Sequence, residues 1–318
     1  MGYRTMDANE AVSRVSYKFT EIAGIYPITP ASPMAEKVDV LASKGEINFW
    51  GNKVKVIEME SEKGAIATVH GALQAGVLAT TYTASQGLLL MIPSIYKMAG
   101  EMLPGVIHVA ARSLSTHSLS IFGDHQDIYA VRQTGACMLS SSSVEEAYHM
   151  AMVSHLASIK SSLPFINFFD GFRTSHEIDK VKEIDLSKLE TLIDKKALRK
   201  FRDNGMISGA TTRGTAENED VYFQHTESRN GYYTKAIDNV IYYMDKINKI
   251  CKTDYKPFNY YGDKSSDAVI IAMGSVCECI KEVVDYLNKK GKKVGLVTVH
   301  LYRPFSNSYL SSIIPSSV

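Results

Sequence analysis

Three side chains capable of chemistry stand just after apolar segments of this sequence. Thr29 lies in the proline-rich stretch IYPITPASPMAEK, Glu62 in IEMESEKGA and Arg112 in HVAARSLSTH, and the polar turn TASQG occupies 83–87. A carboxylate at the end of a buried strand can hold or move a proton, and an arginine there can bind a substrate carboxylate through two hydrogen bonds. Because prolines fix the backbone around the Thr29 hydroxyl, the pattern indicates a site and not a linker.

The residue types alone leave a structural interpretation open at these positions. Glu62 precedes an alanine- and glycine-rich helix, where an acidic side chain is commonly a cap or a first-turn charge. Arg112 fits a surface charge equally well. His125 in FGDHQD has Asp124 and Asp127 beside it, and both aspartates fit a solvated helix N-terminus.

Short apolar segments alternate with helical patterns through the first half of the chain. The segments that predict strands are 24–29, 54–59, 77–83, 105–111, 136–141 and 163–169. This alternation predicts an α/β fold with a six-stranded parallel sheet and helices on both of its faces. Because ligands bind at the carboxyl ends of the strands in such sheets, we expect the chemically capable residues to converge along one edge.

Local signals mark several helix ends. Asp7 and Glu10 have the spacing of a capping box, with Asp in place of the usual Ser or Thr. Ser143 precedes the helical pattern VEEAYHMAMVSHLASIKSS and is expected to cap it. Pro93 predicts a kink or break in the helix that begins near Ser85.

The chain changes character near residue 178. A charged helical pattern comes first, then a stretch without clear period, then a second helical pattern, so residues 178–257 are expected to wrap the sheet domain or contact a partner. From 258 onward one strand–helix–strand unit is expected, with its first strand at 267–275. One such unit is too small for a complete doubly wound domain. We therefore expect a first domain at 1–257 and the truncated start of a second at 258–318.

Composition excludes several classes of protein. The 318 residues carry a net charge of +1 without a basic block, so nucleic-acid binding is not indicated. The longest apolar run, GLLLMIPSI, is too short to span a bilayer. The N-terminus lacks a signal-type apolar core, so a cytoplasmic location is expected. The four cysteines lack zinc-type and ferredoxin-type spacing and are expected to be free thiols: Cys137, Cys251, Cys277 and Cys279.

Several specific strings resemble one enzyme family over nearly the whole chain. They are YPITPASPMAE, EMESEKGA, TYTASQGLLLMIPSIYKMAGEMLPGVIHVAARS, SIFGDHQD, FINFFDGFRTSHE, RGTAENEDVYFQ and MGSVCE through LYRPF. The sequence resembles pyruvate:ferredoxin (flavodoxin) oxidoreductase, and it matches only the N-terminal part of that large enzyme. The resemblance implies a pyrimidine-binding domain for thiamine diphosphate and the start of a transketolase C-terminal-like domain.

The resemblance also implies roles for three residues. Glu62 falls on the glutamate that hydrogen-bonds the aminopyrimidine nitrogen and so activates thiamine diphosphate. Thr29 falls on the threonine that binds pyruvate, and Arg112 on the arginine that binds the substrate carboxylate. No metal ligand is implied within this sequence. The sequence departs from the family with Glu60, Lys63 and the arginine-to-histidine difference at His300, and none of these is a matched site residue.

The family implies further cofactors and partners for the complete enzyme. These are magnesium and [4Fe–4S] clusters, whose ligand segments are missing here, together with coenzyme A, the remaining domains, and ferredoxin or flavodoxin as electron acceptor. A homodimer is expected for the complete enzyme. An organelle of an anaerobic eukaryote stays open as an alternative to the cytoplasm.

The leading hypothesis is therefore part of a pyruvate oxidoreductase, which is expected to be inactive as an isolated chain. Whether it is a split subunit, a truncated gene product or a cut piece stays open. One alternative is a catalytically inactive fragment that serves only in assembly or dimerisation. Another is part of an oxidoreductase for a different 2-oxo acid, such as 2-oxoglutarate.

Overall fold

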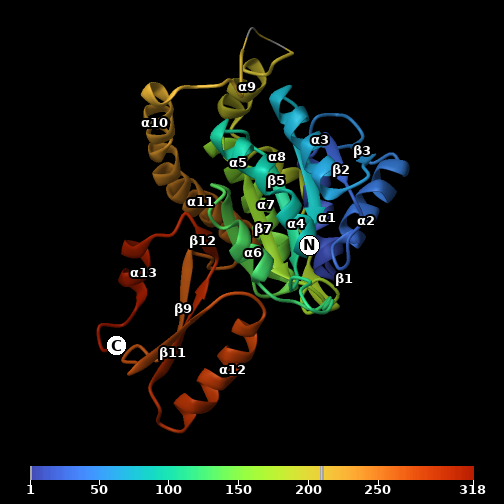
Figure 1. The fold of residues 1–318 in the computed structure, drawn as a ribbon. Coiled ribbons are helices and arrows are strands. Elements are labelled where there is room, and N and C mark those ends of the chain that lie inside the picture. Colours follow the sequence, from blue (N-terminus) through green and yellow to red (C-terminus); the bar gives the residue numbers. More distant parts are fainter. Residues whose placement is uncertain (1, 208, 210) are drawn as a thin grey trace.

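A computed structural model describes residues 2–207, 209 and 211–318. Its centre is a seven-stranded sheet of order β12-β6-β7-β5-β4-β2-β3 (Figure 1). The strands are β2 (Ile22–Ile25), β3 (Lys55–Glu58), β4 (Ala79–Thr83), β5 (Val106–Ala111), β6 (Cys137–Ser141), β7 (Phe165–Asp170) and β12 (Leu301–Arg303). The first six run parallel to one another, which confirms the α/β class. Five of them match their predicted segments to within two residues at each end, whereas β2 ends at Ile25 and shares only residues 24 and 25 with the predicted segment 24–29.

The prediction of a six-stranded sheet was incomplete. The seventh strand, β12, has only three residues and pairs antiparallel with β6. It follows the preceding strand almost directly, so the sequence gives no turn signal that would separate the two strands. Its place beside β6 is set by a contact between segments far apart in the chain, which local periodicity cannot show.

Helices cover the sheet, and its strands β4, β5 and β6 are buried along their whole length. The helices of the first half are α1 (Ala8–Phe19), α2 (Ser32–Ser43), α3 (Glu62–Gln74), α4 (Ser85–Leu90), α5 (Ile92–Gly100), α6 (Gln126–Val131) and α7 (Val144–Ser161). α7 packs against α1, whereas α3 packs against α4 and α5. Burial on both sides is the reason that these strands are continuous apolar runs.

The predicted helix ends are confirmed, although Glu10 pairs with Arg14 and does not complete the capping box at Asp7. The Asp7 carboxylate accepts a hydrogen bond from the backbone N–H of Glu10 at 2.7 Å, and Ser143 caps α7 in the same way. The predicted break falls at Met91, which separates α4 from α5, with Pro93 in the first turn of α5. That position suits proline because a first-turn N–H has no partner within the helix.

The charged segment after residue 178 begins with a strand, contrary to the helical prediction. β8 (Asp179–Lys182) pairs antiparallel with β1 (Tyr3–Met6) in a separate two-stranded sheet. Its partner lies near the start of the chain, so no local pattern identifies it. The helices that follow are α8 (Ser187–Glu190), α9 (Lys195–Asp203), α10 (Glu219–Ser228) and α11 (Asn230–Cys251). Both α9 and α11 pack against α7.

The last segment forms a small mixed sheet of order β10-β11-β9. Parallel strands β10 (Ala268–Ala272) and β11 (Val294–Val299) are joined by α12 (Val276–Lys289), which confirms the predicted strand–helix–strand unit. The sequence prediction missed β9 (Phe258–Gly262), which pairs antiparallel with β11. The final helix is α13 (Asn307–Ile313), and this part lies below the main sheet in Figure 1.

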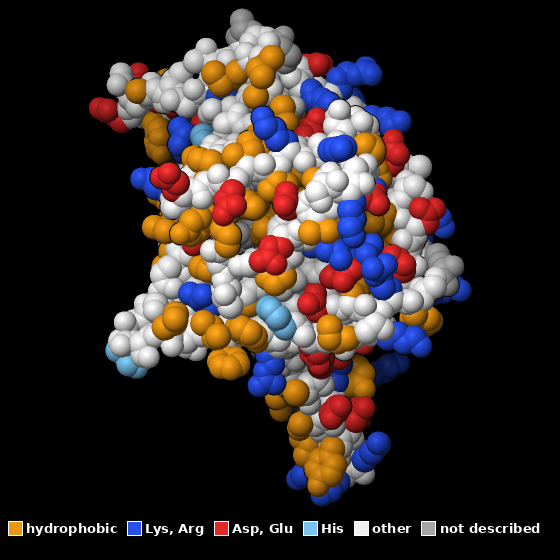
Figure 2. All heavy atoms as spheres, turned by 90° about the vertical axis from the view of Figure 1, so that its right-hand side faces the viewer, with side chains coloured by type: hydrophobic (Ala, Val, Ile, Leu, Met, Phe, Trp, Pro, Cys, Tyr) orange, Lys and Arg blue, Asp and Glu red, His pale blue; other side chains and the backbone are white. Residues whose placement is uncertain are grey.

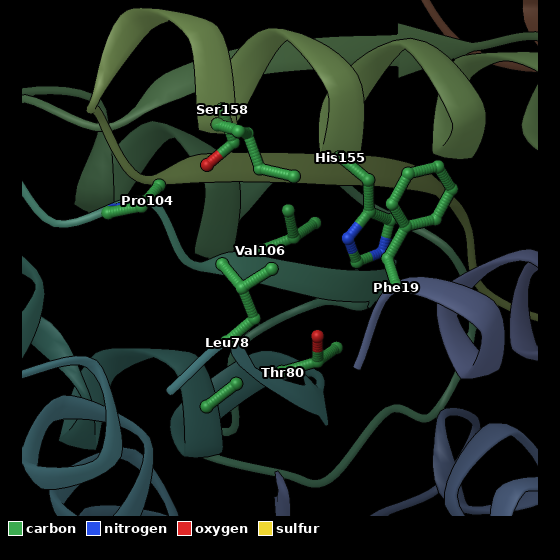
Figure 3. Close-up of a pocket in the computed structure, with 9 residues that line it drawn as sticks. Phe19, Leu78, Thr80, Pro104, Val106, His155 and Ser158 are labelled. Carbon is green, nitrogen blue, oxygen red and sulfur yellow. The ribbon is translucent and has the colours of Figure 1, made fainter. Parts of the chain in front are cut away.

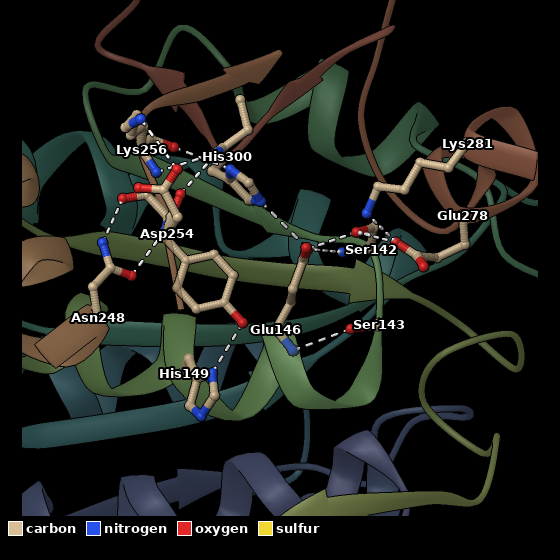
Figure 4. Close-up of polar contacts among 12 residues, drawn as sticks. Ser142, Ser143, Glu146, His149, Asn248, Asp254, Lys256, Glu278, Lys281 and His300 are labelled. Atoms are coloured by element: carbon tan, nitrogen blue, oxygen red, sulfur yellow. Dashed lines mark hydrogen bonds and ion pairs between the residues drawn. The ribbon is translucent and has the colours of Figure 1, made fainter. Parts of the chain in front are cut away.

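A polar cluster joins this last segment to the large sheet (Figure 4). The carbonyl of His300 accepts from the N–H of Ser140 at 2.8 Å, and His300 Nε2 lies 3.4 Å from the Glu146 carboxylate. The N–H and hydroxyl of Ser142 both donate to Glu146, at 2.7 and 2.6 Å. We call Ser142, Glu146 and His300 the junction cluster, because it connects β12 and its approach to the first turn of α7.

The surface carries both charge signs. Figure 2 shows lysine and arginine side chains close to acidic ones over much of the visible face, in keeping with the net charge of +1. Within the described part of the chain, none of the helices combines the length and apolar character that a membrane crossing requires.

Candidate active site

The loops that follow four adjacent parallel strands open along one edge of the large sheet. Thr29 follows β2, Glu62 begins α3 after β3, Ser85 begins α4 after β4, and Arg112 is the first residue after β5. These strands are direct neighbours in the order β5-β4-β2-β3. The structure therefore places the three residues singled out from the sequence at the same carboxyl edge.

Arg112 and Thr29 are in contact. The Nη1 of Arg112 donates to the backbone carbonyl of Thr29 at 2.6 Å. Arg112 is 7% exposed, and its Nε has no hydrogen-bond partner among the described residues. Burial lowers the pKa of this guanidinium, whereas the charges of Asp127 and Glu62 oppose that shift. Arg112 is thus a nearly buried cation with an unused donor.

The proline elbow is held rigidly, although the Thr29 side chain is exposed. The amide of Asn9 donates to the carbonyl of Pro30 at 3.1 Å. A Cβ at Gly171 would lie 2.7 Å from both Pro30 Cγ and the Ala111 carbonyl, so only glycine fits there. The elbow and the end of β5 consequently have a fixed separation.

Glu62 opens α3 and faces α4. The Ser61 side chain caps the helix by accepting from the N–H of Gly64 at 3.2 Å. Glu62 is 7% exposed, and no hydrogen bond found among the described residues involves its carboxylate. A Cβ at Gly87 would lie 2.7 Å from Glu62 Cγ and Oε1, so the close approach of α4 requires glycine. Glu62 is therefore a largely buried residue whose carboxylate takes no donor from the described chain.

Asp127 is buried, so the interpretation as a solvated helix terminus is wrong for this residue. Its Oδ2 accepts from the N–H of Ser85 at 2.8 Å and of Arg112 at 3.0 Å, and its Oδ1 accepts from the N–H of Ile128 at 2.8 Å. Asp127 is 0% exposed, and burial raises its pKa to about 6 against these hydrogen bonds. The sequence contained a sign that Asp127 is buried, because the apolar residue Val131 lies four residues later on the same helix face. Asp124 is exposed, as predicted.

His125 contacts Asp170 at the carboxyl end of β7, where the loop before α12 meets the large sheet. Its Nε2 lies 2.6 Å from Asp170 Oδ1, while the N–H and hydroxyl of Ser275 donate to Asp170 Oδ2 at 2.9 and 2.5 Å. Burial lowers the pKa of His125, but the hydrogen bond and charge of Asp170 outweigh burial and raise it. Gly274, at φ +81, packs directly on both side chains. This contact docks the loop before α12 onto the large sheet.

A small pocket lies at the opposite, amino end of the strands (Figure 3). It is lined by Leu78 and Thr80 at the start of β4, by Val106 at the start of β5, and by Phe19 and His155. Burial lowers the pKa of His155 to about 3, which makes it a neutral packing residue. This pocket takes no part in the carboxyl-edge arrangement.

Metal ligands and reactive thiols do not add to the edge. No group of three or more His, Cys, Asp or Glu side chains suited to a metal ion occurs within 2–207, 209 and 211–318. The cysteines are free, as predicted: Cys137, Cys251 and Cys277 are buried, and Cys279 is exposed. Burial raises the pKa of Cys277 to about 11, so its thiol is unreactive at neutral pH.

Comparison with known proteins assigns both parts of the chain. Residues 14–245 match the family described as pyruvate flavodoxin/ferredoxin oxidoreductase, thiamine diphosphate-binding. Residues 266–316 match the pyruvate:ferredoxin oxidoreductase core domain II. The first match contains six strands of the large sheet, and the second contains β10 and β11 of the small sheet together with β12 of the large one.

Individual relatives cover almost all of the chain. A pyruvate-flavodoxin oxidoreductase of Enterobacter agglomerans is 56% identical over 99% of this chain and 27% of its own length. The pyruvate:ferredoxin oxidoreductase of Moorella thermoacetica is 50% identical over 100% of this chain and 27% of its own length. A pyruvate-flavodoxin oxidoreductase sequence from Nostoc is 48% identical over 98% of this chain and 77% of its own length. The chain thus spans about a quarter of the first two relatives.

A solved structure shares the fold. The 2-oxoglutarate:ferredoxin oxidoreductase from Magnetococcus marinus aligns with a TM-score of 0.74 and 20% identity, over 98% of this chain and 56% of that one. At this identity the likeness shows a shared fold of both sheets.

Proposed function

The chain belongs to the pyruvate flavodoxin/ferredoxin oxidoreductase family, and from this premise we propose that it supplies the pyrimidine-activating and pyruvate-binding side of a thiamine diphosphate site. The complete reaction is the oxidative decarboxylation of pyruvate to acetyl-CoA and CO₂, with electrons passed to ferredoxin or flavodoxin. The observation that carries the proposal is the Arg112–Thr29 contact, which leaves an arginine donor unused at the edge that also holds Glu62.

Glu62 fits the aminopyrimidine end of the cofactor. It is a largely buried residue whose carboxylate accepts no hydrogen bond from the described chain, so both oxygens are available to an outside donor. When bound, thiamine diphosphate supplies the carbon nucleophile and the electron sink that decarboxylation requires. The role of Glu62 is to share a proton with the pyrimidine ring nitrogen, as a positioned acid–base group.

Arg112 and Thr29 fit a 2-oxo acid. The free Nε–H of Arg112 and its remaining guanidinium donors can pair with the substrate carboxylate. The exposed Thr29 hydroxyl stands on the same elbow whose carbonyl fixes Arg112, so the two donors keep a constant separation. Fixed donors lower the entropic cost of orienting the substrate.

The remaining chemistry needs groups beyond these residues. We infer a pyrimidine-binding domain at 1–257 and the start of a second domain at 258–318. Magnesium, coenzyme A, [4Fe–4S] clusters and the acceptor protein would be handled by the other domains of a homodimeric enzyme. The four cysteines have no C-x-x-C spacing for a cluster, so we expect the isolated chain not to turn over pyruvate.

Arg112→Ala in the complete enzyme tests the proposal. We expect kcat/KM for pyruvate to fall, by an amount that corresponds to a loss of about 2–4 kcal/mol of transition-state binding. The affinity for thiamine diphosphate should change little. The assay is pyruvate-dependent reduction of a viologen dye without oxygen, beside a cofactor titration. Arg199→Ala, which removes an exposed arginine of α9, is the matched control.

Two outcomes would contradict the proposal. Equal losses of pyruvate use and cofactor binding would mean that Arg112 supports the fold and does not read the substrate. Faster turnover with 2-oxoglutarate than with pyruvate in the unmodified enzyme would favour the other 2-oxo acid.

A further inference from the structure

Asp127 binds the ends of two neighbouring strands at once. A single oxygen, Oδ2, accepts the N–H of Ser85 after β4 and the N–H of Arg112 after β5, at 2.8 and 3.0 Å. The other oxygen accepts the N–H of Ile128 in its own helix α6. The side chain is wholly buried. These strand-end N–H groups lie where the β4–β5 ladder has stopped, so without Asp127 they would be buried without partners.

Only a carboxylate satisfies this arrangement. It accepts on both oxygens, whereas an asparagine amide would place an NH₂ group against one of the three N–H donors. Burying a carboxylate is costly unless its oxygens accept hydrogen bonds, and all three N–H groups here serve that purpose.

Both backbone segments that Asp127 holds continue into the candidate site. On one side is Arg112, whose guanidinium contacts Thr29. On the other side is Ser85, held at φ +50, a left-handed backbone conformation that non-glycine residues seldom adopt. Two residues further on, Gly87 packs against Glu62. Loss of the Asp127 carboxylate would consequently free the backbone of Arg112 and the first turn of α4, which packs against Glu62.

We propose that Asp127 is a positioning residue for the site: it fixes the backbone of Arg112 and the first turn of α4 relative to each other, and so sets where the substrate carboxylate lies with respect to Glu62. This inference rests on the proposed role of Arg112. Asp127 touches neither substrate nor cofactor, and it acts through the two backbone N–H groups.

Asp127→Asn in the complete enzyme tests the inference. We expect kcat/KM for pyruvate to fall roughly tenfold or more, the scale for losing one hydrogen bond to a charged group, with KM raised more than kcat is lowered. Asp124→Asn is the matched control, because Asp124 lies on the same turn, is exposed, and accepts only the N–H of Gln126. The control should stay within about twofold of the unmodified enzyme.

A double-mutant cycle separates positioning from general structural support. In an Arg112→Ala background, the added effect of Asp127→Asn on pyruvate kcat/KM should shrink to about twofold or less, because the group being positioned is gone. An undiminished effect in that background would overturn the inference, and so would a single Asp127→Asn variant as active as the unmodified enzyme. If Asp127→Asn does not fold, Asp127→Glu keeps the charge but moves it by one methylene, and the same cycle is measured with that variant.

Failure of the two proposals can be told apart. An Arg112→Ala variant with normal pyruvate use would overturn the proposed function and, with it, the substrate part of this inference. A defective Arg112→Ala variant beside a normal Asp127→Asn variant would overturn only the positioning role.

Discussion

Two polar regions of this molecule contain buried acidic residues near helix starts, but they use their hydrogen-bonding capacity differently. At the carboxyl edge, Glu62 accepts no hydrogen bond from the described chain, and Arg112 keeps an unpaired Nε. In the junction cluster, the Glu146 carboxylate receives two hydrogen bonds from Ser142 and lies 3.4 Å from His300. Unused capacity is costly in a folded protein unless a ligand fills it, so the first region suits binding and the second suits stability.

The buried acidic residues of the two regions also have pKa values that are shifted in opposite directions. Burial raises the pKa of Asp127, beside Arg112, to about 6. Burial also acts to raise the pKa of Glu146, but the charge and proximity of His300 and the Ser142 hydrogen bonds outweigh it and lower that pKa to about 2. His300 Nδ1 donates to the Lys256 carbonyl, so Nε2 carries a proton towards Glu146 only when the ring is charged.

The largest expected effect is on catalysis at the edge. Glu62→Gln in the complete enzyme should lower pyruvate-dependent dye reduction by roughly 10²-fold or more, because the carboxylate that we propose to share the pyrimidine proton is lost. Its thermal unfolding should be unchanged, since Glu62 forms no hydrogen bond within the described chain. Glu60→Gln, at the exposed neighbouring carboxylate, is the control. Near-normal turnover of Glu62→Gln would remove this residue from the mechanism.

The junction should show the reverse pattern. His300→Ala should lower the free energy of unfolding by about 2 kcal/mol, because the buried Glu146 carboxylate loses the imidazole that lies 3.4 Å away. Denaturant titration measures this, and the activity of the remaining folded enzyme should stay near normal. His300→Arg should retain most of the stability, since the guanidinium can donate hydrogen bonds to the Glu146 carboxylate. A His300→Ala enzyme that is fully stable but inactive would mean that the junction cluster serves activity and not stability.

Acid should affect the two carboxylates in opposite directions. Glu146 has a folded-state pKa below its ordinary value, so its contribution to stability is present above about pH 4.5 and is lost as the pH falls towards 2. Asp127 has a raised folded-state pKa, so its contribution is present below about pH 4 and is lost as the pH rises through 6.

Denaturant midpoints between pH 3 and 7 would show this contrast. Relative to the unmodified protein, Glu146→Gln should flatten the loss of stability in acid, whereas Asp127→Asn should flatten the loss between pH 4 and 6. Parallel profiles for the two variants would contradict the opposite assignment.

The sequence revealed most of the large sheet and the edge for a physical reason. Buried parallel strands must be apolar runs, and a residue just past such a run must lie at the carboxyl edge, so Thr29, Glu62 and Arg112 could be placed without knowledge of the strand order. The hydrogen bonds that Asp127 accepts from Ser85 and Arg112 could not be derived from the sequence in this way. The partners of Asp127 are backbone N–H groups 15 and 42 residues away, and these leave no trace in residue type. Strands β8 and β12 escaped prediction because each pairs with a distant segment.

The smallest expected effects come from two helix caps with the same local chemistry. Ser61 accepts from the N–H of Gly64 at the start of α3, and Ser143 accepts from the N–H of Glu146 at the start of α7, both at 3.2 Å. Loss of either hydroxyl through Ser61→Ala or Ser143→Ala should cost about 1 kcal/mol of stability. The consequences for activity should differ, because α3 presents Glu62 to the site whereas α7 presents Glu146 to the junction.

Ser61→Ala should therefore lower kcat for pyruvate by a few-fold in addition to its effect on unfolding, since a frayed first turn displaces a group that must be held in place for proton transfer. Ser143→Ala should change unfolding alone, because Ser142 still holds Glu146 through two hydrogen bonds. Matched denaturant titrations and dye-reduction assays on the two variants compare like with like. If the two variants lose the same stability and have equal kcat values, fraying at the start of α3 does not disturb the position of Glu62. The prediction for Ser61→Ala would then be wrong.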